Sequence, residues 1–481
     1  MLKEKENGRP FSLGALRERL AEGPLCDFFM GKWYPLAVCA LVLIGHVFAL
    51  EIWTNVLIML SASLALIICP SVRPIIPAAC NYVFQLSVEH SPALPNYSDY
   101  CFSGWRLPIV VAMFVCVALA FAYFAVKNKI FRGISLTRTP LLLPLLVLSA
   151  AFLLGGVFSP EWTPASLVFG IAQVFWFVFF FVYFYFGMRM ESRDQMADTL
   201  AYTSALTVLV LVGELVARYV KCDGVIVDGE IVKGQILFGW GVWNSMGVAL
   251  CMLIPACFIG VVRQRGVRSF LYLGAALLAL VGAVMTLSRN ALLFGAVFFA
   301  ASVIFACFIG AYRRFYRVIA ALGALLVLAA VILLFDRIPE LVGAFLFDNG
   351  RFTLWRMGIE KFLSAPIFGT GFFAFEFPDD PNYFVGASFL PSFVHQTFVQ
   401  LLSSMGLFGL LSYLYYRVST VACALRRPDP IRLLLFLTSL VLPMMSLIDT
   451  FIFNLWPIIH YSITLAVMCK DGGEEQLPDR I

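Results

Sequence analysis

Long apolar stretches recur along almost the whole chain and are separated by short polar segments. A helix that crosses a bilayer needs about 20 apolar residues. The stretch 139–158 does not alternate apolar with polar positions, as a membrane β-strand would, so helices are the better interpretation. Fourteen apolar runs can be distinguished, at 34–50, 52–70, 74–88, 107–126, 139–158, 164–188, 199–217, 239–262, 269–287, 291–311, 317–335, 394–416, 430–448 and 451–468.

These runs predict an all-α protein, a polytopic transmembrane bundle of about 12–14 helices. The chain then consists of a cytoplasmic tail (1–33), eleven helices (34–335), a large extracytoplasmic loop (336–393), the C-terminal helices (394–468) and a second cytoplasmic tail (469–481). Within the loop, apolar residues recur at helical spacing over 350–363. This spacing predicts a short helix that lies along the membrane interface.

The distribution of Lys and Arg predicts the orientation of the bundle. If the N-terminus lies inside and every run crosses, 25 of the 34 basic residues fall inside and nine outside. Cytoplasmic loops are enriched in Lys and Arg, so both termini are expected in the cytoplasm. The same bias accounts for the net charge of +5, and no clustered basic face indicates a nucleic-acid partner. The polar, basic first 33 residues do not read as a cleavable signal peptide.

Composition excludes two classes of protein. The chain is 61% hydrophobic and 13% charged, whereas a soluble domain is about 45–50% apolar and about 25% charged. It is therefore not a water-soluble enzyme, and an aromatic content of 15% excludes a disordered chain. The twelve cysteines are scattered, mostly within apolar runs, and no C-x-x-C pair indicates a metal or redox site. Cys101 and Cys222 fall in polar loops and could pair.

Three of the arginines that lie on the predicted outer side, against the charge bias, are candidate site residues. Arg289, in L-S-R-N, falls between the outer ends of two apolar runs. It could extend to phospholipid headgroups, or its forked guanidinium could hold a diphosphate. Arg351 and Arg356 are five residues apart in the expected interfacial helix and so lie on different faces. One could face a site while the other faces lipid headgroups.

His395 opens the run 394–416 directly after the largest outer loop. Histidine titrates near neutrality and can accept a proton from a hydroxyl group. Two of the other three histidines lie within apolar runs, where structural roles are favoured. Asn244 and Glu214 lie in the outer parts of their runs, where polar groups are costly unless they are paired or line a cavity. Glu214 could instead pair with Arg218, four residues on.

Together these residues resemble the O-antigen ligase and polymerase superfamily over roughly residues 243–409. The similar segments are N-S-M-G at 244–247, L-S-R-N at 287–290, R-F-T-L-W at 351–355, P-I-F-G-T-G at 366–371 and a histidine motif. The histidine motif is the most specific of them. It consists of His395, Gln396, nine residues and then G-L-F-G at 406–409, at the start of a helix after the largest outer loop.

The resemblance implies a metal-independent, inverting glycosyltransferase that needs no cofactor and acts at the outer face of the plasma (inner) membrane. The donor would be a glycan on a polyprenyl diphosphate such as undecaprenyl diphosphate. The acceptor would be lipid A core, another lipid-linked repeat or a different surface polymer. By position, His395 would act as general base or orient the acceptor, and Arg289 and Arg351 would hold the diphosphate, on which negative charge accumulates. Four further residues are expected to bind substrate: Gln396, Arg356, Asn244 and Glu214.

Two other classes of function remain open, as does the choice between a ligase and a polymerase. One is a transporter or flippase for polysaccharide or lipid-linked oligosaccharide. Such proteins often contain broken helices in two repeats, with ionisable groups near the bilayer midplane. Here the ionisable groups gather at one face and no repeat is detected. The other is a purely structural assembly protein, for which substitutions at the outer face would be silent.

Overall fold

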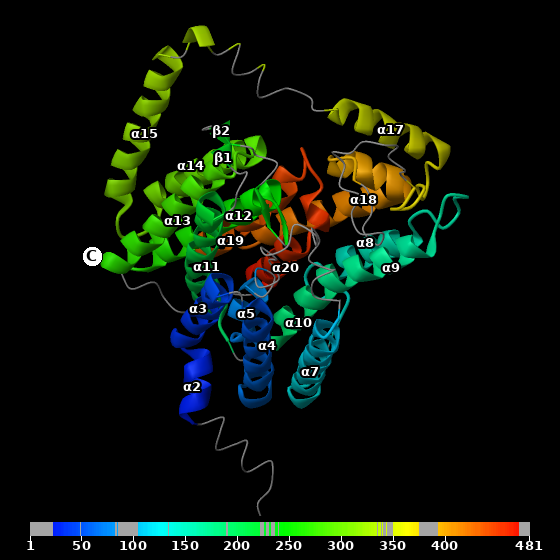
Figure 1. Cartoon of the computed structure of the whole chain (residues 1–481), viewed down its shortest axis with the longest axis horizontal. Coiled ribbons are helices and arrows are strands. Elements are labelled where there is room, and N and C mark those ends of the chain that lie inside the picture. Colours follow the sequence, from blue (N-terminus) through cyan, green and yellow to red (C-terminus); the bar gives the residue numbers. More distant parts are fainter. Residues whose placement is uncertain are drawn as a thin grey trace, which may run out of the picture.

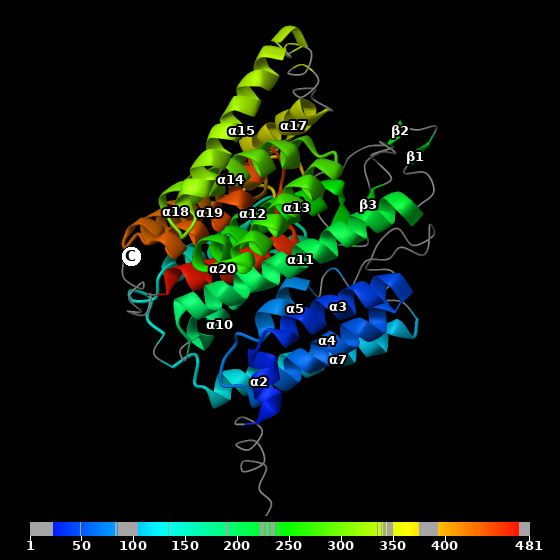
Figure 2. The ribbon, with the colours of Figure 1, turned by 90° about the vertical axis from the view of Figure 1, so that its left-hand side faces the viewer.

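A computed structural model of the chain shows a bundle of helices (Figures 1 and 2). The structure describes residues 23–48, 50–81, 84, 104–132, 134–188, 191–221, 226–227, 230–231, 236–238, 240–333, 335–337, 339, 343, 350–374 and 393–470. Within these ranges, nine helices are long and apolar enough to cross a membrane, a pair bent by 69° could make a tenth, and three more apolar helices are shorter. The predicted all-α, polytopic transmembrane bundle is confirmed. The predicted number of about 12–14 crossings stays a prediction.

The long helices follow the predicted runs closely. They are α4 (Glu51–Ile68), α7 (Arg106–Lys127), α11 (Arg193–Lys221), α12 (Trp243–Arg263), α13 (Val267–Met285), α14 (Arg289–Phe308), α15 (Arg313–Leu333) and α18 (Thr397–Leu425). The ninth span joins α9 (Pro164–Val174), the π-helix η2 (Phe175–Phe179) and α10 (Phe180–Gly187). The bent pair is α2 (Pro24–Met30) with α3 (Trp33–Phe48).

Shorter elements complete the described part of the chain. The helices are α5 (Ile75–Asn81), α8 (Leu142–Leu154), α17 (Arg351–Ser364), α19 (Pro430–Met445) and α20 (Leu455–Cys469), with short 3-10 turns η4 (Phe335–Arg337) and η5 (Phe451–Phe453). Two small antiparallel hairpins precede α12: β1 (Ile226–Val227) with β2 (Glu230–Ile231), and β3 (Leu237–Phe238) with β4 (Gly241–Val242).

Helix α12 forms the centre of the bundle. Its sequence is apolar on all sides, as expected of a helix that is surrounded by others. It packs against α11, α13, α14 and α19, and 89% of its apolar window is buried. By contrast, only 6% of the window of α15 is buried; this helix packs against α14 and extends away from the bundle (Figure 1).

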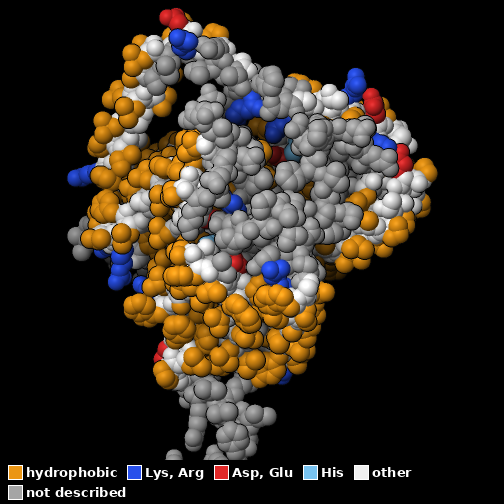
Figure 3. Space-filling view, in the orientation of Figure 1, with side chains coloured by type: hydrophobic (Ala, Val, Ile, Leu, Met, Phe, Trp, Pro, Cys, Tyr) orange, Lys and Arg blue, Asp and Glu red, His pale blue; other side chains and the backbone are white. Residues whose placement is uncertain are grey.

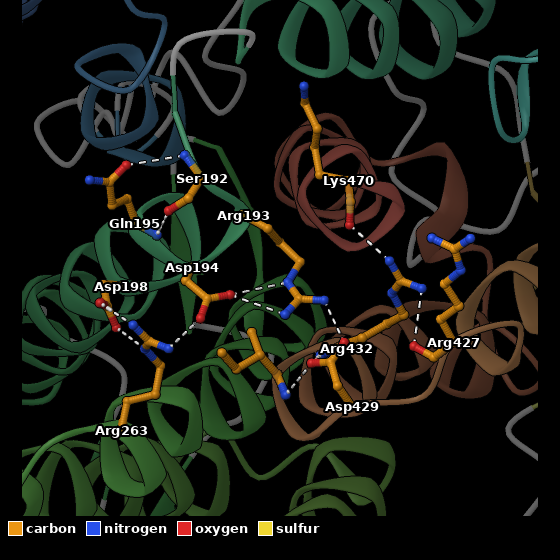
Figure 4. A network of polar contacts seen from close by, with 11 residues as sticks. Ser192, Arg193, Asp194, Gln195, Asp198, Arg263, Arg427, Asp429, Arg432 and Lys470 are labelled. Carbon is orange, nitrogen blue, oxygen red and sulfur yellow. Dashed lines mark hydrogen bonds and ion pairs between the residues drawn. The ribbon is translucent and has the colours of Figure 1, made fainter. Parts of the chain in front are cut away.

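Ion pairs join the helix ends at one end of the bundle (Figure 4). Arg193 begins α11 and pairs with Asp194 and with Asp429, the N-cap of α19. Arg263 ends α12 and pairs with Asp194 and Asp198. This end is the one that the charge bias predicts to face the cytoplasm. The first residues of α12 and α18 and the last residues of α19 lie at the other end, where the candidate site is found.

A helix forms where the interfacial helix is expected. It is α17, and it packs on α18 through a small cluster in which Leu354 and Val394 are buried. A location along the membrane interface stays a prediction. Residues 375–392 of the outer loop, and the proposed partners Cys101 and Cys222, lie outside the described residues.

Candidate functional site

The turn at residues 445–450, between α19 and η5, lies at the centre of the candidate site. Three of its backbone carbonyl groups accept hydrogen bonds from other helices. The donors are the Asn290 Nδ2 (3.0 Å), the Thr397 backbone N–H (3.2 Å) and the Arg351 Nη1 (2.8 Å). These residues lie in the first turns of α14, α18 and α17, so the turn brings together the ends of three helices that are distant in sequence.

His395 is held by a carboxylate from this turn. Its Nδ1 lies 2.9 Å from Oδ1 of Asp449. The Asp449 side chain is 8% exposed and that of His395 is 39% exposed. Asp449 is itself fixed, because its Oδ1 accepts the Thr450 backbone N–H and its carbonyl accepts the Thr397 hydroxyl. A carboxylate on Nδ1 selects the tautomer that leaves Nε2 able to accept a proton.

Asp449 also lies beside Arg351. The Arg351 Nη2 is 3.8 Å from Oδ2 of Asp449, on the side away from the histidine contact. Burial raises the pKa of Asp449, but the His395 hydrogen bond, the charges of His395 and Arg351 and the Thr450 N–H together lower that pKa below its ordinary value. Asp449 is therefore a stable anion that joins the imidazole to the guanidinium.

The backbone of His395 is strained. Its φ is 53°, in the left-handed region that non-glycine residues rarely adopt. Side-chain hydrogen bonds hold the residues around it: the Gln400 Oε1 accepts the Val394 N–H, and the Gln396 Oε1 caps α18 by accepting the Val399 N–H. These bonds fix the backbone on both sides of His395, whose imidazole contacts Asp449. Gln396 therefore caps α18, and its binding of substrate stays a prediction.

Arg289 is placed between two anchored neighbours. Ser288 caps α14 by accepting the Ala291 N–H, and its hydroxyl donates to the Asn244 Oδ1 at 2.7 Å. On the other side, Asn290 donates to the 445–450 turn. Arg289 thus begins α14 half-buried, next to that turn. Figure 3 shows basic, acidic and histidine side chains close together in a hollow between α15 and α17.

The P-I-F-G-T-G segment (366–371) fills a break in α18. The helix is interrupted at Gly406, whose φ is 64° and ψ −161°. On the C-terminal side of the break, the Leu407 and Phe408 N–H groups donate to carbonyls of the segment (2.8 and 3.1 Å). On its N-terminal side, the Ser403 and Ser404 carbonyls accept N–H groups of the segment (2.7 and 3.1 Å). The segment therefore supplies partners for backbone groups that a broken helix leaves without them, as a membrane protein requires.

This arrangement explains the fixed spacing between His395 and G-L-F-G. The nine residues after Gln396 form the short, first part of α18, and the break follows directly. A Cβ atom at Gly406 would lie 2.4 Å from the Ile367 carbonyl, and one at Gly369 would lie 2.4 Å from the Met405 nitrogen. Only glycine allows these two backbones to approach so closely.

Residues 274–414 match the family model described as O-antigen ligase. Residues 274–414 are therefore an O-antigen ligase-like region. This region extends from α13 into α18 and contains Arg289, Arg351 and His395, whereas the N-S-M-G segment at 244–247 lies outside it. The match confirms the resemblance inferred from sequence and supports an O-antigen ligase-like function in general. No curated protein matches the chain.

Two of the residues predicted for the site have partners away from the 445–450 turn. The Arg356 side chain is 76% exposed and pairs with Glu360 on the surface of α17. Glu214 is buried, and its carboxylate accepts a hydrogen bond from the Trp240 Nε1 at 3.1 Å. The structure thus brings Arg351, rather than Arg356, to the 445–450 turn that also holds His395. Within the described residues, no group of three or more His, Cys, Asp or Glu lies together as metal ligands would.

Sequence reasoning missed Asp449. The residue is 54 positions from His395 and belongs to no recognised motif, and it lies beyond the region that matches the O-antigen ligase model. One signal was present in the sequence. Asp449 occupies the two-residue gap between the runs 430–448 and 451–468, at their predicted outer ends, where a carboxylate is costly without a partner.

Proposed function

We propose that this protein is a metal-independent, inverting membrane glycosyltransferase of the O-antigen ligase type. It transfers or polymerises a glycan from a polyprenyl-diphosphate carrier onto an acceptor hydroxyl at the outer face of the plasma (inner) membrane, with both termini in the cytoplasm. The observation that carries the proposal is the His395–Asp449–Arg351 arrangement at the 445–450 turn, which Asn290, the neighbour of Arg289, also contacts. His395, Arg351 and Arg289 lie in the region that matches the ligase family.

The arrangement suits a single displacement at the anomeric carbon. The acceptor oxygen attacks that carbon while its proton passes to the Nε2 of His395, and the bond from the carbon to the diphosphate oxygen breaks. Asp449 stabilises the imidazolium that forms, because its carboxylate already binds Nδ1. One displacement inverts the configuration of the carbon. The departing polyprenyl diphosphate gains negative charge, which fixed guanidinium groups stabilise.

The two arginines contribute through their fixed positions. Arg351 is held by the Ile448 carbonyl and by Asp449, so one face of its guanidinium is oriented before a substrate binds. Arg289 begins α14, where the positive end of the helix dipole adds to its own charge. A diphosphate carries several oxygens and can accept hydrogen bonds from more than one guanidinium.

Transfer by the purified protein in proteoliposomes tests the proposal. With a polyprenyl-diphosphate-linked glycan as donor, we expect product with either a lipid A core acceptor, which would identify a ligase, or a second lipid-linked repeat, which would identify a polymerase. Arg289→Ala should lower the initial rate by roughly 10²- to 10³-fold, since it removes a cation from the leaving group. Movement of donor across the membrane without any transfer would refute the proposal and favour a flippase.

Arg351 and Arg356 provide a matched pair for a second test. Both lie on α17 and both would be replaced by alanine, but only Arg351 contacts the 445–450 turn. We expect Arg351→Ala to lower transfer by roughly 10²-fold or more and Arg356→Ala to leave the rate within about twofold, because its ion pair is solvent-exposed. Equal losses in both variants would show that the arginines act only through the surface of α17.

A further inference from the structure

At the end of the bundle opposite the candidate site, four cysteines form two pairs, and the two thiols of each pair lie close to one another. Cys423, in the last two turns of α18, has its Sγ 3.1 Å from the Sγ of Cys469, the last residue of α20. Cys26 in α2 and Cys69 after α4 have their sulfurs 3.3 Å apart. Sulfurs in a disulfide are about 2.05 Å apart. In each pair, a shift of roughly 1 Å would therefore join the sulfurs.

The two pairs differ in their exposure. Cys423 is half-exposed while Cys469 is buried at 6%. Cys26 and Cys69 are both buried, at 6% and 0%. Thiol–disulfide exchange needs access of the attacked disulfide to a thiolate. Of these four thiols, only that of Cys423 is therefore exposed at the protein surface, where a reagent can reach it.

Charged groups surround the end of α20 that carries Cys469. The Lys470 carbonyl accepts a hydrogen bond from the Arg432 Nη2 at 2.9 Å, which fixes the last turn of the helix. Figure 4 shows Arg427 beside Arg432 at this end, with Arg432 bonded to the Arg427 carbonyl. Cationic surroundings attract an anionic reagent.

We propose that Cys423 and Cys469 form a reversible oxidation site that reacts with a low-molecular-weight disulfide such as oxidised glutathione. The Cys423 thiolate attacks one sulfur of the reagent, which gives a mixed disulfide and releases one glutathione thiolate that takes up the proton lost by Cys423. The Cys469 thiol then attacks the Cys423 sulfur and releases the second glutathione as its thiol. Two protein thiols and one reagent disulfide thus become one protein disulfide and two reagent thiols.

The proposal does not depend on the glycosyltransferase function. The charge bias predicts that this end faces the cytoplasm, where thiols are normally kept reduced. The two thiols would then stay reduced under ordinary conditions and form their disulfide when the disulfide reagent accumulates. The disulfide would link the last turns of α18, whose first residue follows shortly after His395, to the end of α20.

Peptide mapping of the whole purified protein tests the proposal. The protein is reduced in detergent, the reductant is removed, oxidised glutathione is added at neutral pH, and remaining thiols are alkylated before digestion. We expect a Cys423–Cys469 cross-linked peptide that disappears on reduction. Cys469→Ser should stop at a glutathione adduct on Cys423, and Cys423→Ser should leave Cys469 alkylated. Cys26 and Cys69 are the internal control and should be recovered alkylated.

Three results would overturn the proposal: Cys423 remaining unmodified in the wild-type protein, the pair Cys26–Cys69 oxidising first, or a cross-link that forms without any adduct on Cys423. If either serine variant fails to fold, a time course of adduct and disulfide formation in the wild-type protein tests the same order of steps. The adduct on Cys423 must appear before the disulfide and must decay as the disulfide forms.

Discussion

Replacing His395 with alanine should lower the rate of glycan transfer by roughly 10³- to 10⁴-fold, because no other group would accept the proton of the acceptor hydroxyl. Asp449→Asn should lower it by roughly 10²- to 10⁴-fold, although it changes only one atom. The amide cannot stabilise an imidazolium as a carboxylate can, and it can turn its NH₂ group toward Nδ1 and so favour the wrong tautomer. Initial rates at saturating donor and acceptor measure both effects.

A double variant separates catalysis from structure. If Asp449 acts through His395, then His395→Ala with Asp449→Asn should be little slower than His395→Ala alone, since the two residues work as a unit. The Asp449→Asn effect should be mainly on kcat, with the KM for the donor changed by only a small factor. A purely structural role would instead move the unfolding temperature together with both kinetic constants.

Glu360→Gln is the matched control for Asp449→Asn. It also turns a carboxylate paired with an arginine into an amide, but Glu360 is 65% exposed on α17. We expect its rate within about twofold of the wild type. A folded Asp449→Asn variant with nearly full activity would show that the contact with His395 has no part in transfer.

The apolar pattern predicted the helices well because lipid imposes the same requirement on every span. The run 164–188 corresponds to α9, η2 and α10, and the run 291–311 corresponds to α14, shifted by two or three residues at each end. The π-helix at 175–179 was not predicted, since its phenylalanines fit an ordinary helix equally well. Its geometry depends on packing, including the stacking of Phe175 on Phe179.

The candidate site was predicted in part. The predicted outer position of Arg289 and His395 followed from the ends of their runs. The contacts of His395 and of Asn290, the neighbour of Arg289, with the 445–450 turn are tertiary features that local sequence does not indicate. The choice between Arg351 and Arg356 also needed the structure. Leu354 is buried against α18 and lies three positions from Arg351, on the same face of the helix, so the packing of α17 decides which arginine faces the site.

Gly406→Ala should prevent stable folding, and this is the largest stability effect that we expect. Gly406 has φ 64° and ψ −161°, a region open essentially to glycine alone. The added Cβ would lie 2.4 Å from both the carbon and the oxygen of the Ile367 carbonyl, which are backbone atoms and cannot turn aside. The conformation alone costs about 1–3 kcal/mol, and the clash should bring the total above roughly 4 kcal/mol.

The free-energy cost of Gly406→Ala cannot be relieved by moving the P-I-F-G-T-G segment away from α18. If the P-I-F-G-T-G segment moved away, the Leu407 and Phe408 N–H groups and the Ser403 and Ser404 carbonyls would lose their partners together. Each unsatisfied backbone group within a membrane costs several kcal/mol. Gly369→Ala should have a comparable effect, because its Cβ would meet the Met405 nitrogen from the other side of the same contact.

Gly274→Ala, in α13, is the control. A Cβ there would meet nothing within 4 Å, and alanine in a helix is favoured over glycine by about 0.5–1 kcal/mol. Monodisperse yield on size-exclusion chromatography and the unfolding temperature in detergent should therefore collapse for Gly406→Ala and stay equal or rise for Gly274→Ala. If Gly406→Ala were as stable as the wild type, α18 would have to be continuous through residue 406, and the spacing from His395 to G-L-F-G would need another cause.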